Sequence, residues 1–215
     1  MLEYQNLKQV SDLPYLGINL DDTLKWNKHI LELCSNISKK LGFLRRLRKV
    51  LSKDTLKLLY VSIIQPKFDY AISVWGYCSS INQKLVVRLQ HRAARIITNN
   101  MDYINVRGED LVKQLGWQTI EKRRDYFMAM LMYKCVNEAA PRRLIDGLIM
   151  TNDTHELITR SCSNGSLQVP KPNTELFRNS SSYQGSSLWN SLPSQLKNAP
   201  DILSFKKLYK SYFFR

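Results

Sequence analysis

The sequence has few cysteines, and none of them is paired at the spacing of a metal site. The four are spread over the chain without a C-x-x-C pair, at Cys34, Cys78, Cys135 and Cys162. A disulfide-stabilised domain has a denser pattern, and a structural zinc site needs closely spaced pairs. We therefore expect neither feature, and we expect the thiols to be reduced, as they are inside cells.

A long hydrophobic run is also absent. No stretch of about 18 consecutive apolar residues occurs, which argues against a transmembrane helix. The N-terminal segment MLEYQNLKQV contains an acid, no Arg and no basic region followed by an apolar run, so it predicts neither a secretory signal nor a transit peptide. We therefore expect an intracellular chain, cytoplasmic or nuclear, with no membrane partner.

Acidic residues are scarce. The 215 residues include 32 Lys and Arg but only 18 Asp and Glu, a net charge of +14 at pH 7, and 44% of them are hydrophobic. That hydrophobic fraction excludes a disordered tail, and the length suffices for one large domain or two small ones. Net charge bears on association, and this sign favours polyanions, nucleic acid before acidic membrane.

The basic residues gather in two runs. In the first run, between residues 39 and 57, Asp54 is the only acid. The second run, over residues 84–95, has no acid nearby. Its basic residues follow one another at intervals of four, four and three residues, which places them within about 80° of arc on one helix. A single basic run is as typical of a solvated helix face as of a phosphate-binding surface, but two such runs favour phosphate binding. The expected nucleic-acid-binding residues are Lys39, Arg45, Arg46, Lys49, Lys53, Lys84, Arg88, Arg92 and Arg95.

Hydrophobic residues recur at helical spacing over most of the chain, which predicts a mainly α fold. Pro66 is expected to stop or kink the second helix. Asp21, Asp22 or Thr23 is a candidate cap for the first helix, and Ser52 for the second. The expected helices span residues 24–47, 52–66, 81–100 and 118–137.

The composition changes after Pro141. Residues 151–187 are rich in Ser, Asn and Pro, so we expect a loop there, with one or two short strands around residues 167–169. Helical spacing returns in residues 188–214. The expected architecture is a helical bundle followed by an irregular segment and a C-terminal helix.

Five segments form an ordered set that resembles a known family. They are YLGINLDDTLKWNKHI, KKLGFLRRLRKVL, LYVSIIQPKFDYAISVWG, RLQHRAARIIT and LWNSLPSQLK followed by SFKKL. The set resembles the region downstream of the polymerase palm in reverse transcriptases of LINE-type, non-LTR retrotransposons, especially the jockey-like group. The resemblance runs from about Tyr15 to Phe205, and it rests on the order of the five segments, which include the unusual Trp-Asn-Ser-Leu-Pro at 189–193.

The resemblance implies a division of the chain and a partner. Its bundle is similar to a polymerase thumb, which holds an RNA–DNA hybrid or RNA duplex behind an active site built by the palm and fingers. The oligomeric state is not predicted. The implied regions are a palm-to-thumb remnant at 1–22, a thumb-like helical bundle at 23–100, a helical post-thumb region at 101–150, and an irregular segment with the WNSLP motif and last helix at 151–215.

The residues of a polymerase active site are not found. The family carries its carboxylate pair in a Phe/Tyr-Ala-Asp-Asp motif that, with a third aspartate, binds Mg²⁺ in the intact enzyme. The only Asp-Asp here, Asp21–Asp22, follows Tyr-Leu-Gly, where the family has a non-catalytic Asp, so we expect a helix cap. We expect no catalytic residue, metal site or cofactor in this chain. Asp69, Trp75 and Trp189 are expected to be structural, although the two indoles could also stack on bases.

Two hypotheses from different classes remain open. In the first, the chain is a truncated reverse transcriptase fragment that lacks the palm motif and binds nucleic-acid backbones without reading sequence. In the second, it is an inert or host-recruited helical interaction protein without nucleic-acid function. Salt-sensitive binding of nucleic acid discriminates between them.

Overall fold

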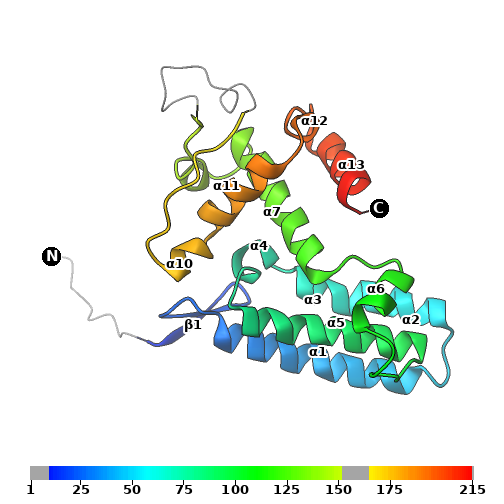
Figure 1. Ribbon diagram of the computed structural model, residues 1–215. Helices are drawn as coiled ribbons and strands as arrows, with labels where there is room; N and C mark the ends of the chain where they lie inside the picture. Colours follow the sequence, from blue (N-terminus) through cyan, green and yellow to red (C-terminus); the bar gives the residue numbers. More distant parts are fainter. Residues whose placement is uncertain (1–9, 152–164, 215) are drawn as a thin grey trace.

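The chain is mainly helical, as the hydrophobic pattern predicts. The computed structural model describes residues 10–151 and 165–214. Figure 1 shows two layers, with α1 and α5 in one and α7, α11 and α13 in the other. None of the helices in these residues is long and apolar enough to cross a membrane.

A hairpin that the sequence patterns do not predict precedes the first helix. Strands β1 (Asp12–Tyr15) and β2 (Ile18–Asp21) pair antiparallel. Both residues of the connecting turn have positive φ, 47° at Leu16 and 78° at Gly17, as a two-residue type I′ hairpin requires. The turn escapes prediction because leucine has no preference for this conformation, unlike the Asn or Asp usually found there.

Two long helices run side by side in the same direction, α1 (Asn27–Leu47) and α5 (Ser80–Thr98). Their first turns are joined by the buried Asn82, whose Nδ2 donates to Asn27 Oδ1 at 2.9 Å and to Lys25 O at 3.3 Å. The bounds of α1 and α5 confirm the helices that the sequence predicts at 24–47 and 81–100.

A third helical segment returns along α1 and contains a π turn. It consists of α2 (Lys53–Leu59), the π-helix η1 (Tyr60–Ile64) and α3 (Gln65–Asp69), and the predicted cap Ser52 accepts a hydrogen bond from Thr55 N. Pro66 lacks an N–H and would clash with the carbonyl four residues earlier in a regular helix. The wider π turn just before it allows the chain to remain helical through Asp69.

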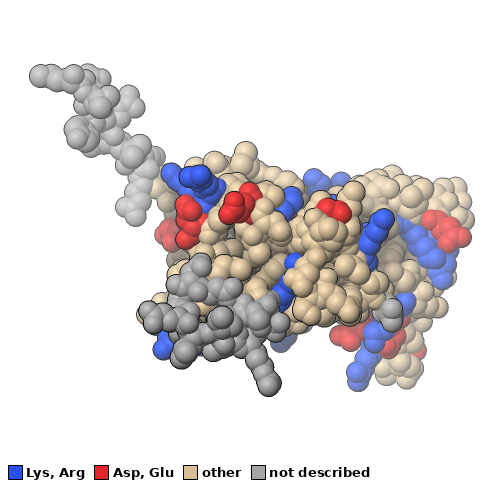
Figure 2. All heavy atoms as spheres, turned by 90° about the horizontal axis from the view of Figure 1, so that it is seen from above, with Lys and Arg blue, Asp and Glu red and all other residues tan. Residues whose placement is uncertain are grey.

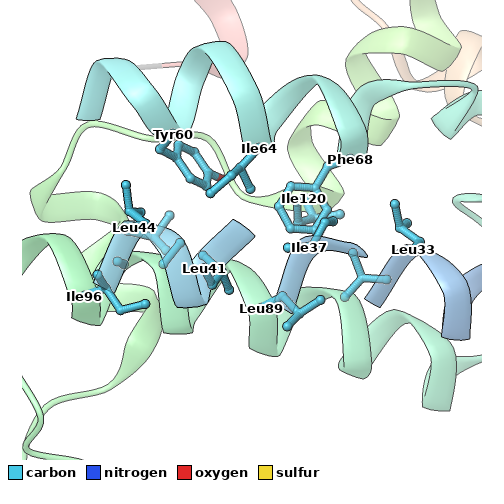
Figure 3. Close-up of a cluster of buried hydrophobic side chains, with 14 of the residues drawn as sticks. Leu33, Ile37, Leu41, Leu44, Tyr60, Ile64, Phe68, Leu89, Ile96 and Ile120 are labelled. Carbon is cyan, nitrogen blue, oxygen red and sulfur yellow. The ribbon is translucent and has the colours of Figure 1, made fainter. Parts of the chain in front are cut away.

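The first hydrophobic core lies between these helices. Figure 3 shows α1 side chains facing the α2–α3 segment on one side and α5 on the other. This core also takes in α6 (Gly108–Gln114) and the start of α7 (Ile120–Val136), so its packing continues past the predicted boundary at residue 100. Its members include Ile37, Leu41, Leu44, Tyr60, Ile64, Phe68, Leu89, Ile96 and Ile120.

A second core forms on the other side of α7. Short helices α4 (Ile72–Trp75), α8 (Arg142–Ile145), α10 (Glu175–Arg178) and α12 (Ser194–Lys197) accompany the longer α11 (Ser181–Ser191) and α13 (Ile202–Phe213). Both α11 and α13 pack against α7. The core of this layer includes Met128, Met132, Trp189, Leu196 and Phe205.

The prediction of a loop over residues 151–187, of which 152–164 lie outside the described residues, is wrong in its C-terminal part, where α10 and α11 form. Helix α11 begins at Ser181 because Ser180 caps it, accepting from Tyr183 N at 3.3 Å. Its small residues then pack tightly, and a Cβ added at Gly185 would lie 2.6 Å from Met132 Sδ. The expected strands near 167–169 reduce to one isolated bridge, between Met150 and Leu167, among the described residues.

Candidate nucleic-acid interface

The excess positive charge is concentrated in the first helical bundle. Residues 23–100 contain 15 Lys and Arg and only three acids, Glu32, Asp54 and Asp69. Asp54 pairs with Lys57 at 3.2 Å, and Asp69 is paired with an arginine of the second layer. The bundle therefore carries a large positive charge that its own acids do not offset.

Three basic residues form an exposed stripe along α5: Lys84, Arg88 and Arg92. The opposite side of the helix, with Leu89 and Ala93, is buried in the first core. Among the described residues, none of the three is in an ion pair. Because four residues rise about 6 Å along a helix, the stripe presents three charges over about 12 Å. These positions are as the sequence predicts.

Arg95 differs from the other members of the predicted stripe. Its side chain is buried, with a relative exposure of 6%. Its Nη1 donates to Asp102 O at 2.8 Å, its Nη2 donates to Val106 O at 2.6 Å, and its guanidinium lies 4.2 Å from the centroid of the Tyr103 ring. The loop after α5 folds back over this position, so Arg95 holds the loop and is not free to contact phosphate.

Arg45 lies on the flank of α1 that faces α5. It follows Asn27 by 18 residues, which is five turns of about 3.6 residues, so the two lie on one line along the helix. Asn27 contacts Asn82 of α5, which identifies that flank. Measured from the Asn27–Asn82 contact, Arg45 lies about 27 Å along α1 and Arg92 about 15 Å along α5. Since Arg45 is also exposed, it can extend the line of positive charge beyond the end of the α5 stripe.

The other predicted residues lie in different places. Arg46 is exposed in the last turn of α1, Lys49 follows the helix, and Lys53 opens α2, each of them exposed. Lys39 lies away from α5, at the rim of an apolar groove of about 430 Å³ between α1 and η1. This groove is lined by Lys39, Lys40, Phe43, Leu44, Leu59, Ile63 and Ile64.

On the face on the side of the second layer, the described residues that Figure 2 shows carry charges of both signs. Figure 2 views the molecule from that side, and Lys and Arg are interspersed there with Asp and Glu over largely uncharged surface. The stripe of Lys84, Arg88 and Arg92, together with Arg45, is therefore the candidate interface.

Asp21 organises the turn between the hairpin and α1. Its carboxylate accepts hydrogen bonds from the backbone N–H groups of Thr23 at 3.1 Å, Lys25 at 3.0 Å and Trp26 at 2.8 Å. Partial burial alone would raise the pKa of Asp21, but these bonds and one from the Thr23 hydroxyl outweigh it and lower the pKa. Asp21 thus serves the turn before the helix, whereas the N-cap position itself is Trp26, with no side-chain bond.

The remaining candidates for chemistry are structural. Asp69 accepts from Arg123 Nε at 2.6 Å, as its predicted role as a structural pair requires. Trp75 and Trp189 are buried, at 2% and 1% exposure, so neither is open for base stacking. No group of three or more His, Cys, Asp or Glu within residues 10–151 and 165–214 is placed to hold a metal ion. Cys162 lies outside the described residues.

Two curated proteins are similar to part of the chain. A probable RNA-directed DNA polymerase from transposon BS of Drosophila melanogaster is 31% identical over 125 residues, which cover 57% of this chain and 14% of that protein. A probable RNA-directed DNA polymerase from transposon X-element of the same organism is 27% identical over 100 residues, covering 45% of this chain and 11% of that protein. No family model matches, and no solved structure matches.

The chain is therefore related to transposon RNA-directed DNA polymerases over about half of its residues. The matched parts make up only 14% and 11% of these relatives. The relationship supports the assignment of the chain, from its ordered motifs, to the reverse transcriptases of retrotransposons, without distinguishing a group or a region of the enzyme.

Proposed function

We propose that the chain is the thumb and C-terminal region of a jockey-like, LINE-type non-LTR reverse transcriptase, and that it binds the backbone of an RNA–DNA hybrid or RNA duplex. The observation that supports this most is the exposed stripe of Lys84, Arg88 and Arg92 on α5, with the exposed Arg45 of the parallel helix α1 beyond its end. This role suits a protein of the cytoplasm or nucleus.

The mechanism of binding is electrostatic. Each Lys or Arg that neutralises a phosphate releases condensed counterions, so affinity falls steeply with salt. Contacts to phosphates position a duplex without reading its bases, because every sequence presents the same backbone. The first core keeps α1 and α5 in fixed register, so the four charges are held in place before the duplex arrives.

Polymerisation is assigned to residues outside this chain. In the proposed whole enzyme, the palm and fingers supply the carboxylates that hold Mg²⁺, and the present residues grip the primer–template duplex. Asp21 is already engaged by three backbone N–H groups, which suits a structural role better than a metal ligand.

A charge-reversal pair tests the proposal. The double variant R88E/R92E should bind a short RNA–DNA hybrid at least about tenfold more weakly at moderate salt, because two phosphate contacts become repulsive. The matched control K113E/K134E makes the same change of net charge at exposed positions on α6 and α7, outside α5. Equal affinities of R88E/R92E and the control would refute the interface.

The groove beside Lys39 favours the second candidate function, a helical interaction protein. The groove lies between α1 and η1, has a volume of about 430 Å³ and is lined mainly by apolar side chains. Exposed apolar surfaces of this kind mark interaction sites. This reading predicts that the wild-type chain shows no hybrid binding even at low salt, whereas a polar substitution at Phe43 abolishes binding of a protein partner.

A further inference from the structure

The loop between α5 and α6 exposes apolar side chains although its backbone is firmly held. Within residues 99–107 the relative exposure is 43% for Met101, 69% for Tyr103 and 93% for Ile104. Apolar and aromatic side chains at the tip of an ordered loop are available to a partner without a prior rearrangement.

The loop is fixed by two sets of hydrogen bonds. Arg95 donates from its guanidinium to the carbonyls of Asp102 and Val106, on either side of the tip. The Asp102 carboxylate accepts from Ile104 N at 3.0 Å and from Asn105 N and Nδ2, both at 2.9 Å. The backbone at Tyr103 is therefore held from both sides.

The Tyr103 ring has one covered face and one open face. The Arg95 guanidinium lies 4.2 Å from the ring centroid and covers one side, in cation–π geometry. Tyr103 as a whole residue nevertheless has a relative exposure of 69%, so most of its surface, on the side away from Arg95, is open to solvent. A ring supported from behind and open in front is suited to stack on a planar group, because it loses little freedom when it does so.

The loop lies at one end of the basic stripe. Arg92 and Arg88 precede Arg95 on α5 by three and seven residues, which is a rise of about 4.5 Å and about 10 Å along the helix. A duplex whose phosphates lie on Arg88 and Arg92 therefore extends toward Tyr103. The planar groups that such a ligand presents are its bases, which stack on aromatic side chains when they are unpaired.

We propose that Tyr103 is a stacking platform for an unpaired base at the end of a duplex bound to the α5 stripe, with Arg95 as the positioning residue behind its ring. The inference rests on the proposed function, since it requires the duplex on Lys84, Arg88 and Arg92. It assigns base contact to a residue outside the two basic runs, and to neither of the buried tryptophans.

Three probes separate base stacking from backbone contact. They are a blunt RNA–DNA hybrid, the same hybrid with a single-stranded extension of a few nucleotides, and the hybrid with an abasic extension of equal length. The wild-type chain should bind the base-containing extension about tenfold more tightly than the abasic one, which carries the same phosphates. Y103A should lose that preference and keep its affinity for the blunt hybrid, because the exposed ring contributes little to folding.

Two variants serve as controls, and the outcomes are distinct. Y103F should retain the preference, and Y15A removes another exposed tyrosine, on β1, without effect. If wild-type chain binds the base-containing and abasic extensions equally, or if Y103A keeps the preference, the platform is refuted while blunt-hybrid binding still supports the proposed function. If R88E/R92E binds the blunt hybrid as tightly as wild type, the proposed function itself fails.

Discussion

The side-chain amide of Asn82 on α5 donates a hydrogen bond of 2.9 Å to Oδ1 of Asn27 on α1. Asn82 is buried, and its second bond goes to the backbone carbonyl of Lys25. Because these bonds join the start of α1 to the first turn of the parallel helix α5, they set the register between the two helices and hence the position of Arg45 relative to the α5 stripe. The position of Arg45 relative to the other proposed phosphate contacts thus depends on a partly buried polar contact.

Removing this contact should weaken both folding and binding. N82L leaves Asn27 Oδ1 and Lys25 O without their donor, so the free energy of unfolding should fall by about 1–3 kcal/mol. Urea denaturation monitored by circular dichroism measures this change. N82S, which keeps a small donor, should lose less, and an N82L variant as stable as wild type would contradict the register role.

Arg95 and Arg92 should behave oppositely although they are one turn apart. R95M removes two charged hydrogen bonds and leaves the carbonyls of Asp102 and Val106 unpaired, which should cost about 3 kcal/mol of stability. R92M removes an exposed side chain and should change stability by less than about 0.5 kcal/mol. Thermal unfolding of both variants measures the difference, and equal effects would show that Arg95 does not hold the loop.

The ion pair between Asp69 of α3 and Arg123 of α7 should stabilise the contact between the layers. Both side chains are largely buried, at 17% and 18% exposure. D69N should cost about 2 kcal/mol, because it leaves a charged guanidinium with a weaker partner in a shielded site. A double-mutant cycle with R123M measures the coupling, and additive effects would mean that the pair contributes nothing.

The approach of α11 to α7 should depend on Gly185. A Cβ there would lie 2.6 Å from Met132 Sδ and 3.3 Å from Met128 Sδ, and both methionines are buried. G185V should therefore lower the free energy of unfolding by roughly 1–3 kcal/mol through overpacking. The double variant G185V/M132A should recover part of that loss, because the shorter alanine side chain leaves space for the valine. Chemical denaturation of G185V and of the double variant measures both changes, and an undiminished stability of G185V would contradict the close packing.

Stability should fall in mild acid because of His29. It lies on α1 between the indoles of Trp26 and Trp75, with ring centroids 6.4 and 5.8 Å away, and burial lowers its pKa despite an opposing effect of Glu32. The unfolded chain therefore binds a proton below about pH 6.5 that the folded chain resists. Stability should be fully present above that pH and decline as the pH falls further.

The variant H29L tests this assignment. It should flatten the dependence of the free energy of unfolding on pH between about 7 and 5, although His91, whose pKa burial also lowers, still contributes. Denaturant titrations across this range give the profile. An unchanged profile in H29L would assign the acid sensitivity to other groups.

The long helices could be predicted because their patterns are strong and local. The segments 24–47, 81–100 and 118–137 each repeat apolar residues at helical spacing, and α1, α5 and α7 follow them closely. Helix α11 is not predicted because its first residues are Ser, Tyr, Gln and Gly, which have weak helical preference; the Ser180 cap and the packing of Gly185 against the methionines of α7 support a helix there. The β1–β2 hairpin was missed because its turn is Leu-Gly.

The candidate site could be predicted only in part. Residue spacing gives the angle of a residue around its own helix, but not which other parts of the fold pack against it. Arg95 has the same helical phase as Arg88, and only the fold of the following loop covers it. Lys39 and Arg45 come from one basic run, yet one lies at the groove with η1 and the other faces α5. No sequence pattern singles out Tyr103, since its proposed role depends on a contact with Arg95 that only the folded loop creates.

The dependence of hybrid affinity on salt tests the central claim most directly. With phosphate contacts from Lys84, Arg88, Arg92 and Arg45, the slope of log K against log salt concentration should be about −3 to −4, at roughly −0.9 for each contact. The slope should be equal for hybrids of unrelated sequence, and R88E/R92E should reduce it by about 2. A slope near zero, or one that changes with sequence and not with R88E/R92E, would contradict the proposal.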